Sequence, residues 1–177
     1  MNEQELHDAL WSLIAPGFMR RADVSAAVAA LVGGTPAVEL VDALWELRLK
    51  QLREPVEHPT DDERVERAFE ALRAEGVFAN MNFGVNEANG VYESEAVIPF
   101  GTPFAFFHQG DTARLGWPPA ELSIFFGTPD APGPRPNVGE QVRAAFEQQG
   151  LSVSWDGTVD DPIHLEGIVW MRPLPRD

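Results

Sequence analysis

The side chains best suited to chemistry lie in residues 101–112, Gly-Thr-Pro-Phe-Ala-Phe-Phe-His-Gln-Gly-Asp-Thr. The aromatic run in this stretch ends in His108 and Gln109, and Asp111 and Thr112 follow at once. Because a carboxylate can orient an imidazole for proton transfer, His108 and Asp111 are candidate catalytic residues, with Gln109 and Thr112 as candidate binding residues. Sites are often built where a buried strand ends, but a strand can also simply turn there. The sequence is compatible with a functional site at this strand end and with an ordinary turn.

A second pair, His164 and Glu166, lies two residues apart and therefore on one face of a strand. If this pair met His108 and Asp111, two imidazoles and two carboxylates could hold a divalent metal. No HExxH-like or dense histidine spacing supports such a centre, so no metal and no other cofactor is predicted. The chain also lacks a Gly-x-Ser-x-Gly elbow and a phosphate-binding loop.

Three tryptophans, Trp117, Trp155 and Trp170, could line a ligand cleft, although such residues more often pack in the core or at its rim. Of these, Trp117 and Trp155 are candidate binding residues.

The elements that must position these residues change from helices to strands near Gly76. Apolar residues recur at helical spacing in the first third of the chain, and Asn2 with Glu5 predicts a capped start. Thr60 and Glu63 predict a second capping box. Helices are expected near residues 2–15, 23–32, 35–52, 60–75 and 138–149.

Beyond Gly76 the apolar period becomes two, which is typical of strands. Six strands are expected, at residues 77–83, 91–98, 104–108, 122–126, 151–155 and 163–170. The first two are expected to form a hairpin, and Gly167 to mark a bulge. The unbroken apolar run Phe104–Phe107 predicts a central strand that is covered on both faces.

The fold class that follows is α+β, with N-terminal helices before a mixed, mainly antiparallel sheet of about six strands on which helices pack. Residues 53–59 contain two prolines and are the best candidate for a linker. They separate a helical region, residues 1–54, from an α+β domain, residues 60–177. We expect the two to pack together as one unit.

The net charge of −15, from 28 acidic and 13 basic residues, is the strongest global feature of the sequence. Such a field repels phosphate backbones, so nucleic acid is not an expected partner, whereas a basic protein is. The acidic, polar residues 1–7 do not resemble a secretory signal, and no apolar run approaches the roughly 20 residues of a membrane helix. Together with the absence of cysteine, this predicts a soluble, cytoplasmic protein.

Three segments resemble a bacterial domain family of unknown function that is common in actinobacteria. They are residues 60–76, the motif Phe-Phe-His-Gln-Gly-Asp-Thr at 106–112, and the motif Trp-Asp-Gly-Thr at 155–158 within residues 150–158. The resemblance implies a compact cytoplasmic α+β protein but no activity, cofactor or catalytic residue. Some members carry cysteines in the turn that matches residues 84–90, where this chain has none, so a metal site built there in relatives is absent or altered here.

Two functions from different classes follow. The first is a small binding or protein-interaction module whose acidic surface meets a basic protein. The alternative is a hydrolase-like enzyme that acts on a small molecule, with His108 as the general base oriented by Asp111.

Overall fold

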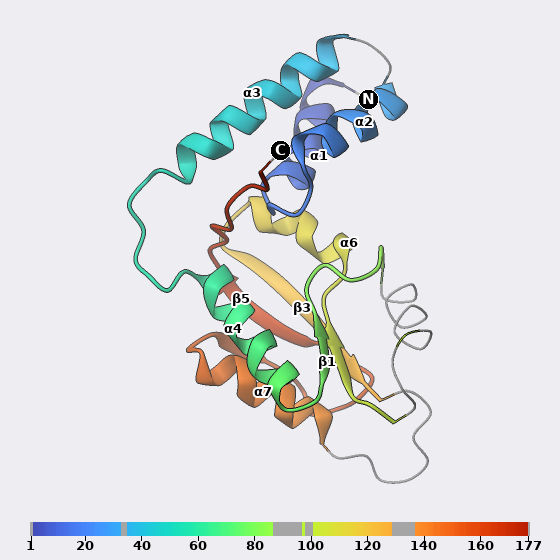
Figure 1. The fold of residues 1–177 in the computed structure, drawn as a ribbon, viewed down its shortest axis with the longest axis vertical. Helices are drawn as coiled ribbons and strands as arrows, with labels where there is room; N and C mark the ends of the chain where they lie inside the picture. Colours follow the sequence, from blue (N-terminus) through green and yellow to red (C-terminus); the bar gives the residue numbers. More distant parts are fainter. Residues whose placement is uncertain (1, 33–34, 87–96, 98–100, 129–136, 177) are drawn as a thin grey trace.

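The computed structural model describes residues 2–32, 35–86, 97, 101–128 and 137–176. The N-terminal helices gather at one end of an elongated molecule, and the sheet with the helices that pack on it forms the other end (Figure 1). The elements are α1 (Glu3–Ile14), α2 (Arg21–Val32), α3 (Thr35–Gln51), α4 (Asp61–Ala74), β1 (Phe78–Asn80), β2 (Phe104–Phe106), α6 (Gln109–Thr112), the 3₁₀ helix η1 (Ala113–Gly116), β3 (Ala120–Gly127), α7 (Val138–Gln148), β4 (Ser152–Ser154) and β5 (Ile163–Ile168).

The N-terminal helices begin and pack as their sequence predicts. The Asn2 side chain accepts a hydrogen bond from the Glu5 backbone N–H, and the Glu5 carboxylate accepts one from the Asn2 N–H, each at 2.8 Å. This capping box satisfies two donors that have no partner within the helix. The three helices share an apolar core of Leu10, Trp11, Ile14, Ala15, Val24, Val28, Val41, Leu44 and Trp45. Among the described residues, no helix has the length and apolar character of a membrane span.

The sheet has the strand order β1-β2-β3-β5-β4. β1 and β2 run parallel and the other neighbours are antiparallel, so the predicted mixed, mainly antiparallel α+β fold is confirmed. Within the described residues the sheet has five strands rather than the six expected, and the remaining predicted strand, residues 91–98, lies almost entirely outside those residues. The hairpin predicted between residues 77–83 and 91–98 lies there too.

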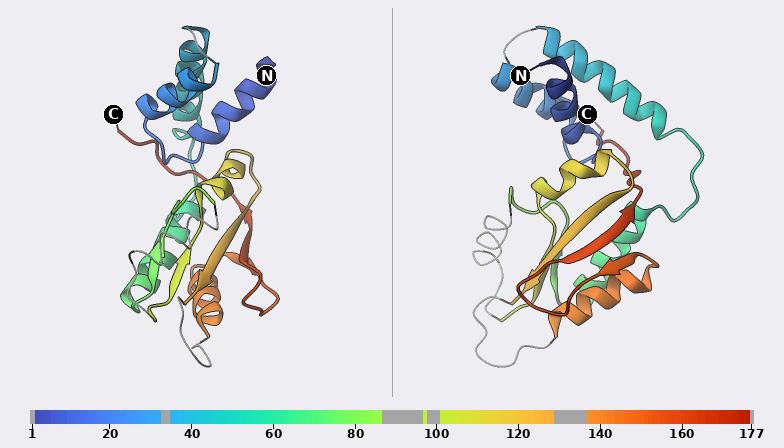
Figure 2. Two further views of the ribbon diagram at one scale, coloured as in Figure 1. Left: turned by 90° about the vertical axis from the view of Figure 1, so that its right-hand side faces the viewer. Right: turned by 180° about the vertical axis from the view of Figure 1, so that it is seen from behind.

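One face of the sheet is covered by α4 and α7, which lie against each other (Figure 2). The Glu63 carboxylate accepts a hydrogen bond from the Thr60 backbone N–H at 2.9 Å, as the predicted capping box requires. Phe69 of α4 meets Phe146 of α7 edge to face, with ring centroids 5.4 Å apart. These helices and the inward side chains of the strands form the main core.

The aromatic strand β2 lies between β1 and β3, and all four residues Phe104–Phe107 are buried. Phe107 faces the main core, where it contacts Phe69 and Trp170. Phe106 belongs to a separate aromatic cluster with Phe104, and neighbouring Phe78, Phe83 and Phe125 pack against it. The prediction of a strand covered on both faces is confirmed.

Two local expectations need correction, and a third is confirmed. The predicted strand 104–108 ends at Phe106, because His108 begins the short helix α6. Residues expected to be irregular, 115–121, instead contain the end of η1 and the start of β3. The bulge predicted at Gly167 is present: its φ is +71°, and the register between β3 and β5 shifts at this point.

The helical end and the sheet are joined through the C-terminal segment. Trp170 is buried, its indole N–H donates to the Pro16 carbonyl at 2.9 Å, and its own carbonyl accepts from Arg48 at 2.8 Å. The Asp62 carboxylate at the start of α4 accepts from the Met171 N–H at 3.0 Å. Trp170 and Met171 therefore connect α3 to the start of α4 through hydrogen bonds.

Candidate functional site

His108 and Asp111 come together, but as the cap of a helix. The His108 backbone N–H donates to Asp111 Oδ2 at 3.2 Å, and the Asp111 backbone N–H donates to His108 Nδ1 at 3.3 Å. The His108 ring also stacks on Phe125, with centroids 5.1 Å apart. Gly110 allows this fold-back, since a Cβ there would lie 3.0 Å from His108 Cε1. The spacing of the two residues permits this contact without requiring it, and the structure shows that it is made.

The geometry of the helix cap determines which hydrogen bonds the His108 ring can make with Asp111. His108 Nδ1 lies 3.2 Å from Asp111 Oδ2 and 3.3 Å from the Asp111 nitrogen. An orienting carboxylate must accept a hydrogen bond from a protonated Nδ1. The cap instead uses Nδ1 as a hydrogen-bond acceptor, and one nitrogen cannot serve as donor and acceptor at once. A side chain that satisfies the local backbone in this way is the usual behaviour of a capping residue.

We expect His108→Ala to destabilise the protein by about 1 kcal/mol, the usual effect of losing an N-cap side chain. His108→Asn should recover part of this loss, because an asparagine oxygen can accept the same N–H. Urea unfolding of both variants measures the difference. If the Asn variant were no more stable than the Ala variant, the ring contact with Phe125 would be the contribution of His108, and not the cap.

Gln109 and Thr112 line a small cavity next to this cap. The cavity has a volume of about 40 Å³ and lies between the α1–α2 connection, Asn82 and α6. The Thr112 hydroxyl donates to the Gln109 carbonyl at 2.7 Å within α6. His108 and Asp111 do not line this cavity.

The two candidate tryptophans lie in different surroundings. Trp155 packs edge to face on Phe126 and donates its indole N–H to the Thr158 carbonyl at 2.8 Å. Gly139 is required beneath it, because a Cβ there would lie 2.4 Å from the Trp155 ring. These are packing contacts. Trp117, by contrast, is 46% exposed.

The Trp-Asp-Gly-Thr motif that begins at Trp155 builds the turn between β4 and β5. The Asp156 carboxylate accepts from the Thr158 N–H and hydroxyl at 2.8 and 2.9 Å. The hydrogen bond from the Thr158 backbone is the main reason that the pKa of Asp156 is lowered. Gly157 has a φ of +87°, which a side chain would disfavour. The motif therefore has a sufficient structural explanation.

His164 meets neighbours on β3 rather than the other candidates. Its Nδ1 lies 3.3 Å from Glu121 Oε1 and 3.3 Å from Ser123 Oγ. A Ser-His-Glu triad would need the serine and the carboxylate on different ring nitrogens. Glu166 is exposed on the same strand. Within the described part of the chain, which includes His108, Asp111, His164 and Glu166, no three such side chains are placed to hold a metal ion.

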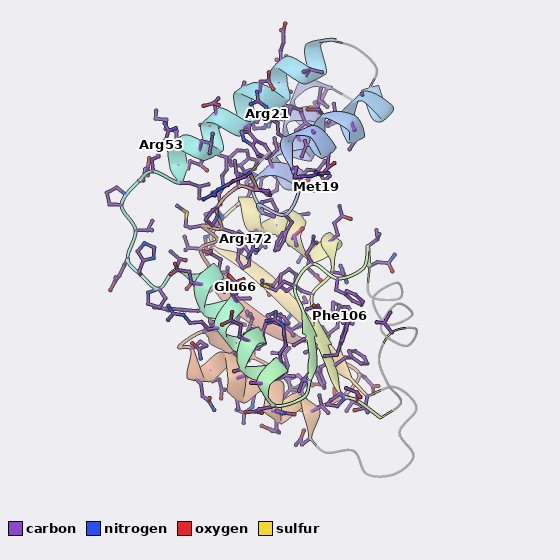
Figure 3. All side chains as sticks on the ribbon, in the orientation of Figure 1. Met19, Arg21, Arg53, Glu66, Phe106 and Arg172 are labelled. Atoms are coloured by element: carbon purple, nitrogen blue, oxygen red, sulfur yellow. The ribbon has the colours of Figure 1, made fainter. Side chains whose placement is uncertain are left out.

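A larger concave site, absent from the sequence-based candidates, lies between α3 and α4. This α3–α4 cleft has a volume of about 780 Å³, within the range of roughly 300–1,000 Å³ that is usual for ligand pockets. It is lined by the end of α3, the segment that follows it, the start of α4 and the C-terminal residues 171–174. In Figure 3, Arg53, Glu66 and Arg172 come from three of these four parts.

The cleft combines apolar and charged side chains. Its apolar lining is Leu49, Leu52, Pro55, Val56, Met171, Pro173 and Leu174. Its charged lining is Glu54, Asp62, Glu63 and Glu66 against Arg53 and Arg172, with His58 beside them. Because carboxylates outnumber guanidinium groups four to two, the charge of the cleft suits a basic ligand.

Two ion pairs shape this lining. His58 Nδ1 lies 3.0 Å from Glu63 Oε2, and Arg172 Nη1 lies 3.8 Å from Glu66 Oε2. The Arg172 guanidinium also stands 4.9 Å from the centroid of the Phe18 ring. Among the described residues, no ion pair involves Arg53 or Glu54, so both charges remain available to a ligand.

The Glu63 carboxylate should give stability a pH dependence. The hydrogen bond from His58, followed by that from the Thr60 N–H, lowers the pKa of Glu63 below its ordinary 4.5. A lowered folded-state pKa contributes stability above pH 4.5, which is lost as the pH falls through the folded-state value. Glu63→Gln should therefore be less stable than the parent at neutral pH, and the difference should shrink in acid.

Thermal unfolding at several pH values tests this, with Glu70→Gln on the exposed side of α4 as the matched control. A stability difference for Glu63→Gln that stayed constant across the acid range would contradict the assignment, and the control should stay close to the parent throughout.

Sequence reasoning missed the cleft for a definite reason. Its lining comes from residues 49–66 and 171–174, which are more than 100 residues apart in the sequence. Residues 53–59, which connect α3 to α4, have the composition of an ordinary linker. The only local signal in the sequence is the mixture of charged and apolar residues around Pro55 and Pro59, with Arg53 and Glu54 before the first proline and Val56 and His58 between the two.

Comparison with known proteins yields one match. A family model described as "Domain of unknown function (DUF6891)" matches residues 1–174. No curated protein and no solved structure matches the chain.

Proposed function

The chain belongs to the DUF6891 family, which offers no activity to transfer, and from the structure we propose that it is a cytoplasmic binding module that holds a basic segment of a partner protein in the α3–α4 cleft. The observation that carries this proposal is the cleft itself, which is the right size for a ligand and in which carboxylates outnumber guanidinium groups. The fold alone would not suggest a function.

The chemistry of the cleft suits a peptide-like ligand better than a small anion. Its apolar lining residues, among them Leu52, Val56 and Leu174, can cover the methylene stems of lysine or arginine side chains. Glu54 and Glu66 can meet their charged ends. The net charge of −15 attracts such a partner from a distance and repels anionic competitors.

The hydrolase-like alternative has weaker support. It needs His108 to act as a base oriented by Asp111, but the contacts of these two residues are those of a helix cap. Neither the α3–α4 cleft nor the small cavity beside α6 includes His108 in its lining. Nothing in this geometry favours the enzyme over the binding module.

Capture of partners from native lysate at low and high ionic strength tests the proposal, because association driven by opposite charges weakens with salt. The informative variant is the triple change Glu54→Gln, Glu63→Gln and Glu66→Gln, which removes three carboxylates from the cleft. The control is Glu39→Gln, Glu46→Gln and Glu70→Gln, which removes the same charge from exposed helical positions.

We expect a basic protein that is captured by the parent and the control at low salt, released at high salt, and not retained by the cleft variant. Equal retention by both variants would show that the cleft is not the binding site. Recovery of no partner at either ionic strength would count heavily against a binding function.

A further inference from the structure

The small cavity beside α6 has the features of a second site. It lies where the parallel strands β1 and β2 end, against the connection between α1 and α2. Leu13, Phe18 and Met19 supply apolar walls, and Asn82 and Thr112 supply polar groups. Figure 3 labels Met19 at the helical end of the molecule, on the side nearest the sheet. The cavity and the α3–α4 cleft share no lining residue.

One polar atom of this lining is unsatisfied. Asn82 Oδ1 is buried and has no hydrogen-bond partner among the described residues. Asn82 also has a φ of +53°, a value that no other described residue except glycine reaches. Hydrogen bonds from Phe83 N–H to the Phe107 carbonyl (2.8 Å) and from Gln109 N–H to the Gly84 carbonyl (3.0 Å) fix the chain around it. Since a buried acceptor without a donor is unfavourable, a ligand here must bring a donor.

We propose that this cavity binds the end of an alkylammonium group, such as a lysine side chain, with Asn82 Oδ1 accepting one of its N–H donors. The volume of about 40 Å³ holds roughly three water-sized groups, at about 10–15 Å³ each. This matches the ammonium nitrogen and its last two methylenes. A planar guanidinium group has four non-hydrogen atoms and fits less well.

The surroundings of the cavity favour a cation over an anion. Among the residues that the structure describes, no lysine or arginine lines it, and the net charge of the chain is −15. The methylenes of the ligand would contact Leu13 and Met19, while its ammonium group reaches the polar end. The Arg172 guanidinium already stands over the Phe18 ring, 4.9 Å from its centroid, so the proposed anchor for the ligand is the Asn82 oxygen.

Methyl NMR of the full chain with labelled methionines tests the proposal. The sequence has four methionines, of which Met19 lines this cavity and Met171 lines the α3–α4 cleft. Butylammonium should shift the Met19 signal saturably, and a Met19→Leu variant identifies that signal. Because Met171 lines the α3–α4 cleft, its signal reports on that cleft separately. A failure of butylammonium to bind beside α6 can therefore be distinguished from a failure of the proposed function.

Variants at Asn82 supply the matched controls. Asn82→Gly tolerates the positive φ but removes the oxygen, and it should weaken butylammonium binding roughly tenfold or more. Asn82→Asp keeps the shape, adds a negative charge and should bind more tightly. Butylguanidinium and butanol should bind far more weakly than butylammonium.

The absence of a saturable Met19 shift, an unchanged affinity in Asn82→Gly, or equal binding of butanol would each overturn the proposal. N-acetyl-lysine amide decides the source of the ligand. If it binds as butylammonium does, the site suits a lysine of a partner protein. If only butylammonium binds, the site is supported and its ligand is a free amine.

Discussion

Phe107→Ala and Phe106→Ala should each lower the free energy of unfolding by about 3–5 kcal/mol, through lost burial and a residual cavity. Both side chains are fully buried, and they lie on opposite faces of the sheet. Phe107 packs on Phe18 and Phe69 in the main core, and Phe106 packs between Phe83 and Phe125 in the smaller cluster. Each loss is a large share of the roughly 5–15 kcal/mol that stabilises a typical domain.

Denaturant unfolding of both variants measures these losses, with Val159→Ala as the control because Val159 is 74% exposed. The control should stay within about 0.5 kcal/mol of the parent, as surface changes usually do. If both phenylalanine variants behaved like the control, β2 would be an exposed edge and the sheet order described above would be wrong.

Arg48→Met should destabilise the protein by about 1–3 kcal/mol, because it leaves a buried acceptor without its donor. The Arg48 side chain is buried and donates to the Trp170 carbonyl at 2.8 Å. Burial lowers the pKa of the Arg48 guanidinium, and the nearby Asp62 carboxylate opposes this effect. Methionine keeps the apolar stem but restores neither the hydrogen bond nor the charge opposite Asp62.

Arg53→Met, five residues further along, is the matched control, since Arg53 is exposed. Thermal unfolding should show a clear loss for the first variant and almost none for the second. If the Arg48→Met protein were as stable as the parent, removing the cost of burying the Arg48 charge would offset the lost contacts. Arg48 would then not stabilise the packing of the C-terminal segment.

The sequence predicted the parts of the fold that are decided locally. The capping boxes at Asn2 and Thr60 and the aromatic strand before His108 depend on neighbours within four residues, and all three are present. The position of β5 between β3 and β4 depends on pairings between distant segments, which local pattern does not encode.

For the candidate sites too, local sequence predicts some features and not others. The spacing of His108 and Asp111 permitted their contact without requiring it. Their role could not be predicted either, because a histidine can use Nδ1 for a carboxylate or for a backbone N–H. Asn82 gave no signal in the sequence, since its buried oxygen and positive φ arise only from the surrounding packing. The α3–α4 cleft required the return of residues 171–174, which no local pattern predicts.

The proposed binding of a basic segment in the α3–α4 cleft can be tested by recording amide NMR spectra of the full chain during titration with a short oligolysine peptide. We expect saturable shifts concentrated at residues 49–56, 60–66 and 171–174, which weaken with added salt and are lost in the Glu54, Glu63 and Glu66 triple variant. Shifts spread evenly over exposed carboxylates elsewhere, or unchanged in that variant, would contradict it.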